Sequence, residues 1–234
     1  MRLDKFLAHA GMGTRKEVKK LIRSKAVRVN DQIVRNDDYK IEEEIDRVYV
    51  YEEEIIYSQF YYVMLNKPDG YISATMDDRD PTVIDLIYED FAFSLFPVGR
   101  LDKDSEGLLL LTNDGALAHN LLSPKKHVDK EYHVILEKEC SDDDIIKITQ
   151  GVDLNEEEKS GPAIVKRIDE KSMYLTIQEG KFHQVKRMMH AIDNEVIYLK
   201  RVRMGTLKLD DQLALGEYRL LSDEEIKMLK GENE

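Results

Sequence analysis

The chain has little of what several classes of enzyme need. Its 234 residues include one cysteine, Cys140, which excludes a disulfide framework and a cysteine-ligated zinc finger and fits a reducing compartment. The six histidines show no His-Glu-x-x-His or other metal-binding spacing. Neither a Gly-x-Gly-x-x-Gly nor a Gly-x-x-x-x-Gly-Lys-Ser/Thr motif occurs, so no dinucleotide cofactor and no NTP hydrolysis is indicated. We therefore expect chemistry that uses neither a cofactor nor a metal.

Long hydrophobic runs are also missing. The longest uninterrupted aliphatic run is the four leucines at 108–111, far short of a membrane span. The first residues, Met1–Lys5, carry an acid and lack the apolar core of a signal peptide. These absences favour a soluble, cytoplasmic protein with no membrane partner, and we expect a monomer.

Positive charge is scarce overall but concentrated at the start of the chain. The formal net charge is −12. Residues 1–35 nevertheless contain ten Lys and Arg against three Asp and Glu, whereas residues 36–54 contain two against nine. A basic segment on an otherwise acidic protein indicates local binding of RNA or DNA.

Residues 1–56 have the pattern of a small module of two helices and a hairpin. Apolar residues at helical spacing over 3–10 predict a first helix, and Thr14 to Glu17 form a capping box that opens a second. Alternating valines around the Asn30-Asp31 turn predict the hairpin. A solvated charged helix is the alternative to an RNA-binding one. We favour RNA binding by the bases of the second helix, namely Arg15, Lys16, Lys19, Lys20 and Arg23.

Residues 57–234 mix strands and helices without a regular βαβ rhythm, and residues 51–60 resemble a connector. The patterns predict helices over 80–87, 116–122, 141–149 and 183–191. They predict strands over 61–65, 108–111, 132–136, 163–165, 173–177, 196–202 and 218–220. We expect an α+β fold, in which a small helix-and-hairpin domain (1–56) precedes a larger domain (57–234) with a mixed or antiparallel sheet flanked by helices.

The segment from Pro97 to Gly115 holds the main candidate site. It sets Asp102 beside Arg100, just ahead of the apolar run Leu108–Leu111. An aspartate with a cation in reach stays ionised at neutral pH, as a nucleophile or general base must. An ordinary surface turn before a core strand fits the spacing equally well.

A second charged cluster begins at Glu179. Residues 181–203 contain six Lys and Arg against two Asp and Glu, and a glycine precedes the helix predicted at 183–191. This arrangement favours a helix start that faces phosphate. Apolar residues give the helix a buried side, which directs Lys186 or Arg187 toward a specific partner. A solvated basic helix is the alternative.

Tyr132 is a weaker candidate. A tyrosine on a strand usually packs in the core, but in an RNA enzyme it can stack on a displaced base, a contact worth about 1–3 kcal/mol.

Taken in order along the chain, these motifs resemble the pseudouridine synthases. Gly99 to Leu111 is similar to the active-site motif of that family. Three further stretches resemble the motifs that flank it in the family, namely Leu65–Gly70, Lys130–Tyr132 and Glu179–Met188. Residues 2–30 are similar to the S4 RNA-binding domain. The combination resembles the RsuA branch, and residues 62–83 look most like the small-subunit (16S) rRNA enzyme.

The resemblance implies cofactor-free isomerisation of uridine to pseudouridine. Asp102 would match the catalytic aspartate, which either adds to uracil C6 or takes a sugar proton to form a glycal. Tyr132 would match the tyrosine that packs on the target base. Lys186 would match the basic partner of the aspartate, often an arginine in the family, with Arg187 as the alternative. Arg100 would help to hold the flipped nucleotide.

The expected partner is ribosomal RNA or a small-subunit assembly intermediate, and Lys67 completes the residues predicted to contact RNA. The alternatives are the same reaction on 23S rRNA and a non-catalytic S4-type assembly factor. A carboxylate-based sugar hydrolase would need a second catalytic carboxylate at a matched distance, which no motif supplies.

Overall fold

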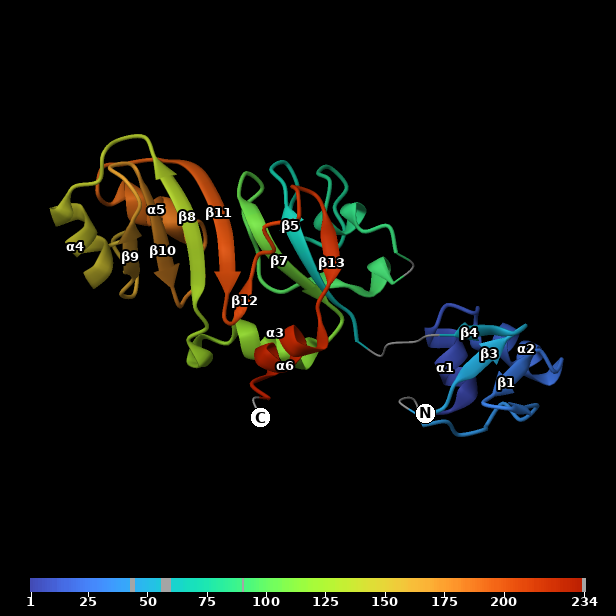
Figure 1. The fold of residues 1–234 in the computed structure, drawn as a ribbon. Coiled ribbons are helices and arrows are strands. Elements are labelled where there is room, and N and C mark those ends of the chain that lie inside the picture. The colour runs from blue at the N-terminus through green and yellow to red at the C-terminus, as the bar shows by residue number, and fades with distance from the viewer. Residues whose placement is uncertain (43–44, 56–59, 90, 233–234) are drawn as a thin grey trace. The chain divides into compact units, whose positions relative to one another are not determined.

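The computed structural model describes the chain except residues 43–44, 56–59, 90 and 233–234. It divides into two compact units, Met1–Phe60 and Tyr61–Glu234. The boundary predicted between residues 56 and 57 lies outside the described residues. Both units combine helices with sheets, which confirms the predicted α+β class (Figure 1). Among the described helices, none has the length and apolar character needed to cross a membrane.

The N-terminal unit packs two helices on a four-stranded antiparallel sheet of order β2-β1-β3-β4. The elements are α1 (Leu3–His9), α2 (Arg15–Arg23), β1 (Val27–Val29), β2 (Gln32–Ile33), β3 (Val48–Val50) and β4 (Glu53–Ile55). The predicted capping box is confirmed: Glu17 accepts a hydrogen bond from the Thr14 backbone N–H at 2.8 Å, and Thr14 accepts one from the Glu17 N–H at 3.4 Å. The prediction of a connector over 51–60 is wrong at residues 53–55, because these pair with β3 as a strand.

The larger unit is built on a nine-stranded sheet whose main order is β13-β5-β7-β11-β8-β10-β9, with β6 paired to β7 and β12 to β11. The strands are β5 (Tyr62–Lys67), β6 (Phe96–Pro97), β7 (Glu106–Thr112), β8 (Lys130–Leu136), β9 (Ile164–Arg167), β10 (Ser172–Ile177), β11 (Val196–Met204), β12 (Leu207–Lys208) and β13 (Tyr218–Leu220). Among the strand pairings described, only that of β7 with β11 is parallel, so the sheet is mixed, one of the two arrangements predicted.

Helices and short 3-10 turns cover this sheet (Figure 1). They are η1 (Val83–Leu86), η2 (Ala92–Ser94), α3 (Gly115–Leu122), η3 (Pro124–Lys126), α4 (Asp142–Gln150), α5 (Gln184–His190) and α6 (Asp223–Lys230). The helix predicted over 80–87 is therefore a 3-10 turn, and α6 was not predicted.

The four leucines of β7 are buried on both faces of the sheet. Leu109 and Leu111 belong to one hydrophobic cluster, which includes residues of α5. Leu108 and Leu110 belong to another, which includes residues of α3 and α6. Alternate residues of a strand point to opposite faces, so a continuous apolar run is what a strand covered on both sides requires.

Gly107 allows the parallel strands β7 and β11 to approach closely. It pairs with Arg201, and a Cβ added to it would lie 2.3 Å from the Arg201 carbonyl oxygen. Its φ of +99° is also a conformation that side chains of L-residues disfavour. The glycine thus allows β7 to pair with β11 directly after the loop that carries Asp102.

Candidate active site

Asp102 lies in the loop between β6 and β7, and residues that follow β5 hold this loop in place. Ser73 Oγ donates to the Leu101 carbonyl and accepts from the Leu101 N–H, both at 2.9 Å. The Gly70 N–H donates to the Lys103 carbonyl at 2.9 Å. The backbone on both sides of Asp102 is therefore fixed from the same neighbouring segment.

Lys67 holds the same loop from inside the protein. Its side chain is fully buried, and its ammonium donates to the carbonyls of Pro68, Lys103 and Ser105 at 3.0, 3.1 and 2.8 Å. Burial lowers the pKa of Lys67 to about 8, although nearby carboxylates oppose the shift. The prediction that Lys67 contacts RNA does not agree with this burial. The side chain instead orders the carbonyls around Asp102.

Helix α5 brings a cation to Asp102, and the residue directly before the helix brings an imidazole. Lys186 Nζ lies 3.5 Å from Asp102 Oδ2 and 2.5 Å from Asp104 Oδ1. His183 Nε2 lies 3.6 Å from Asp102 Oδ1. Burial is the largest single influence on Asp104 and opposes its charge, but the hydrogen bond and the charge of Lys186, together with smaller favourable interactions, lower the pKa of that carboxyl. A quarter of the Asp102 side chain remains exposed, so the carboxylate can reach a substrate.

Neither of the two arginines predicted near Asp102 forms an ion pair with it in the described part of the chain. Arg187 binds Glu158 at 2.7 Å and the Phe182 carbonyl at 3.2 Å, which leaves Lys186 as the cation of α5 that faces the aspartate. Arg100 is exposed and has no ion pair in the described part of the chain, so it is not the cation beside Asp102.

Tyr132 lies on β8, paired with Leu175 of β10 and Arg201 of β11. Its side chain is 7% exposed. It belongs to the same hydrophobic cluster as Leu101 and Val185, the neighbours in sequence of Asp102 and Lys186. Tyr132 is thus part of the apolar layer that supports the site.

Two residues of the site, Asp104 and His183, were not predicted. Asp104 stands two residues after Asp102, and His183 lies in the second charged cluster directly before α5, so both were in the motifs but without an assigned role. The role of Asp104 could not be predicted, because it depends on contact with Lys186, which is 82 residues away in the chain.

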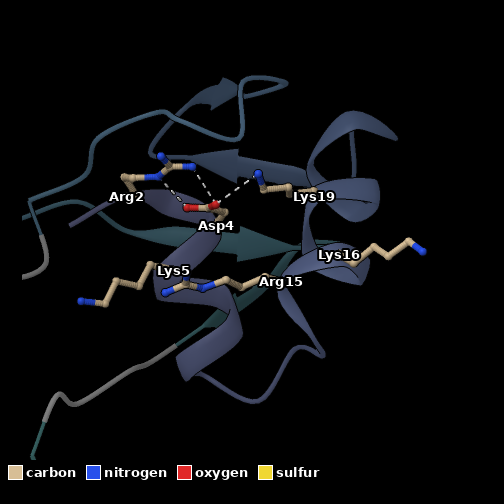
Figure 2. A pocket seen from close by; sticks show the side chains of 6 residues that line it. All are labelled: Arg2, Asp4, Lys5, Arg15, Lys16 and Lys19. Carbon is tan, nitrogen blue, oxygen red and sulfur yellow. Dashed lines mark hydrogen bonds and ion pairs between the residues drawn. The ribbon is translucent and has the colours of Figure 1, made fainter.

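The N-terminal unit carries a second candidate site, a basic pocket of about 460 Å³ between α1 and α2 (Figure 2). Its lining consists of Arg2, Asp4, Lys5, Arg15, Lys16 and Lys19. Asp4 is buried and binds Arg2 at 2.9 Å, with Lys19 at 3.9 Å. In Figure 2 the side chains of Lys5 and Arg15 extend on the same side of this ion pair, whereas Lys16 points away.

The predicted RNA-binding bases of α2 fall into two groups. Lys19 and Arg23 bind Asp37 at 3.2 and 3.3 Å, and the hydrogen bond from Lys19 is the main cause that lowers the pKa of Asp37. The other three have no ion pair within the described ranges, namely Arg15, Lys16 and Lys20. Their charge is therefore available to a phosphate.

The acids beside this pocket have the spacing of a metal site but already have counterions. Ligand atoms of Asp4, Asp37 and Asp38 lie within 4.8 Å of one another. Arg2 binds Asp4 and Asp38, and Lys19 binds Asp37. We infer no metal from this cluster, because its negative charge is matched by side chains.

Comparisons with known proteins agree with this architecture. The family model described as RNA pseudouridylate synthase matches residues 61–191, and that of the S4 domain matches residues 1–44. The chain therefore belongs to the RNA pseudouridylate synthase family, enzymes that isomerise uridine to pseudouridine in RNA. The predicted resemblance is confirmed.

Relatives match the chain over almost its whole length. It is 49% identical to the uncharacterized RNA pseudouridine synthase YtzG of Bacillus subtilis (strain 168), over 98% of both chains. It is 42% identical to ribosomal small subunit pseudouridine synthase A of Escherichia coli (strain K12), over 97% of this chain and 98% of that one. A crystal structure of a pseudouridylate synthase is 38% identical and aligns with a TM-score of 0.70, over 98% and 99% of the two chains.

Proposed function

We propose that this enzyme converts a uridine of small-subunit ribosomal RNA to pseudouridine, with Asp102 as the catalytic carboxylate and without a cofactor. The observation that carries the proposal is the position of Asp102: partly exposed on a loop that Lys67 and Ser73 hold, with the Lys186 ammonium 3.5 Å away. The reaction needs a carboxylate as a nucleophile or base, and the Lys186 ammonium lies close enough to pair with it.

The other residues have the following roles in this proposal. Asp102 either adds to C6 of the uracil or takes a proton from the sugar to give a glycal. Lys186 balances the negative charge of Asp102 until the carboxylate reacts, when that charge passes to the uracil. Tyr132 supports the target base, and the exposed guanidinium of Arg100 helps to keep the nucleotide out of its helix. Flipping costs a few kcal/mol, which such contacts offset.

The N-terminal unit supplies the sequence-independent part of RNA binding in this proposal. Arg15, Lys16 and Lys20 carry unpaired charge on α2, and phosphate contacts by such residues dominate the affinity of proteins for nucleic acids. Lys19 and Arg23 contribute less, because Asp37 already neutralises part of their charge.

Small-subunit rRNA is the favoured substrate because a relative with that activity in its name is 42% identical along nearly the whole chain. We propose further that the enzyme acts in the cytoplasm, as a monomer, on free rRNA or on an assembly intermediate of the small subunit.

The test is to map pseudouridine in both large rRNAs of a strain that lacks this gene, with and without the gene restored. The proposal predicts the loss of one pseudouridine from small-subunit rRNA and its return on complementation. A loss confined to 23S rRNA would move the target to the large subunit. No loss in either RNA would indicate a non-catalytic role in assembly.

A further inference from the structure

Phe182 is an exposed aromatic residue directly beside the candidate active site. It precedes α5, and 72% of its surface is exposed. Its ring stacks on His183, with ring centroids 3.8 Å apart and an angle of 20° between the planes. The same His183 lies 3.6 Å from Asp102. One face of the Phe182 ring is therefore ordered by the site, and much of the ring remains open to solvent.

The backbone that carries Phe182 is fixed by polar contacts on both sides. Arg187 donates to the Phe182 carbonyl at 3.2 Å and is itself held by Glu158 at 2.7 Å. The Lys181 N–H donates to Gln184 Oε1 at 2.9 Å, and the Lys181 ammonium lies 3.2 Å from Glu179. These contacts order the turn before any ligand binds, so little conformational entropy remains to be lost there.

Exposure alone does not identify a binding residue, because single apolar side chains are common on protein surfaces. Phe93, for example, is 87% exposed. Phe182 differs in two respects. Its ring is stacked on His183, which contacts Asp102, and Lys186 lies four residues further along the chain, in α5. An ordered aromatic face next to cations is the arrangement with which proteins bind the bases of single-stranded nucleic acids.

We propose that Phe182 is a stacking platform for a base of the RNA substrate that neighbours the target uridine. This inference rests on the proposed function for the nature of the ligand. When the target nucleotide leaves its stack, the adjacent base loses a neighbour, and the open face of Phe182 replaces it. The contact lies outside the reacting atoms, so it strengthens binding of the substrate and leaves the chemical step unaffected.

The expected size of the effect follows from the strength of base–aromatic stacking. Loss of one stacked base costs about 5- to 150-fold in affinity, equivalent to about 1–3 kcal/mol. Phe182→Ala and Phe182→Leu should both raise the Kd and KM for a small-subunit rRNA transcript by that factor, with kcat nearly unchanged. Leucine tests the aromatic face specifically, since it keeps apolar bulk. Phe182→Tyr should bind as the wild type does, and Phe93→Ala is the matched control.

The chain contains no tryptophan, which gives a direct optical readout. In Phe182→Trp the new indole is the sole tryptophan, and stacking on a base should quench its fluorescence as RNA is added. A short single-stranded RNA and the rRNA transcript serve as the two probes, and Phe93→Trp should show no quenching with either.

The proposal is overturned if Phe182→Ala binds both RNAs as the wild type does and the Phe182→Trp emission stays unchanged at saturation. It is also overturned if Phe182→Ala lowers kcat with KM unchanged, because that result would mean that the Phe182 ring only holds His183 in position and binds no base. The proposed function fails separately: Asp102→Asn with full activity would contradict it, even while the Phe182→Trp signal is quenched.

Discussion

Lys186 presents its ammonium nitrogen 3.5 Å from Oδ2 of Asp102, although the two residues come from distant parts of the chain. The same nitrogen lies 2.5 Å from Asp104. One cation thus serves two carboxylates, and the closer one anchors it. Removal of this cation leaves the site with two acids and an imidazole that is charged only when protonated.

Replacement of Lys186 by methionine should therefore lower kcat by about a hundredfold or more, the usual cost of removing a preorganised electrostatic group. Lys186→Arg should retain part of the activity because the charge remains. Arg187→Met is the control, since its guanidinium binds Glu158 and the Phe182 carbonyl. The measurement is single-turnover pseudouridine formation, and equal losses in both methionine variants would contradict the assignment.

The stability that Lys67 contributes should rise with pH. Its pKa is lowered by burial from 10.5 to about 8, so between these values the unfolded chain binds more protons than the folded one. The free energy of unfolding then increases with pH, by at most about 1.4 kcal/mol per pH unit for one group. Urea unfolding of the wild type and of Lys67→Met across this window isolates the effect, and a constant difference between them would refute it.

The two groups of bases on α2 should differ in their response to salt. Each phosphate contact contributes about 0.7–0.9 to the slope of log affinity against log salt concentration. Arg15→Gln combined with Lys16→Gln should therefore reduce that slope by about 1.4–1.8. Lys19→Gln combined with Arg23→Gln should reduce it much less, because Asp37 pairs with both. Equal reductions would show that the pairing with Asp37 breaks on RNA binding.

Gly107→Ala should cost more than about 2 kcal/mol of unfolding free energy, because the methyl group would meet the Arg201 carbonyl and φ is positive. Activity should fall as well, since β7 begins where the Asp102 loop ends. Gly115→Ala is the control: no atom lies within 4 Å of its added Cβ, and its φ is not in the left-handed range. Thermal unfolding compares the two, and similar losses would count against the proposed close approach of β7 and β11.

Much of the fold could be predicted from local sequence. The capping box at Thr14 marks the start of α2, and the run Leu108–Leu111 marks a strand buried on two faces. Strands β6 and β12 could not be predicted, because each has two residues and exists only through pairing with a neighbouring strand.

The site was predictable only in part. Asp102 stands out in its motif, and the family resemblance named Lys186 or Arg187 as its basic partner. Adjacency along the chain suggested Arg100 instead, although adjacency says little about where a side chain points in a loop. Lys186 takes that place through the packing of α5. The burial of Lys67 could not be predicted either. A lysine beside a turn is usually exposed, but here three backbone carbonyls accept hydrogen bonds from its ammonium and make burial possible.

The most direct test of the account is the yield of pseudouridine from small-subunit rRNA incubated with Asp102→Asn. Asparagine keeps the size of the side chain but removes the negative charge, so binding of the RNA should be retained while pseudouridine formation falls to background. An Asp104→Asn variant made in parallel should keep measurable activity. Pseudouridine formation by Asp102→Asn at the wild-type rate would contradict the central claim that this carboxylate carries out the reaction.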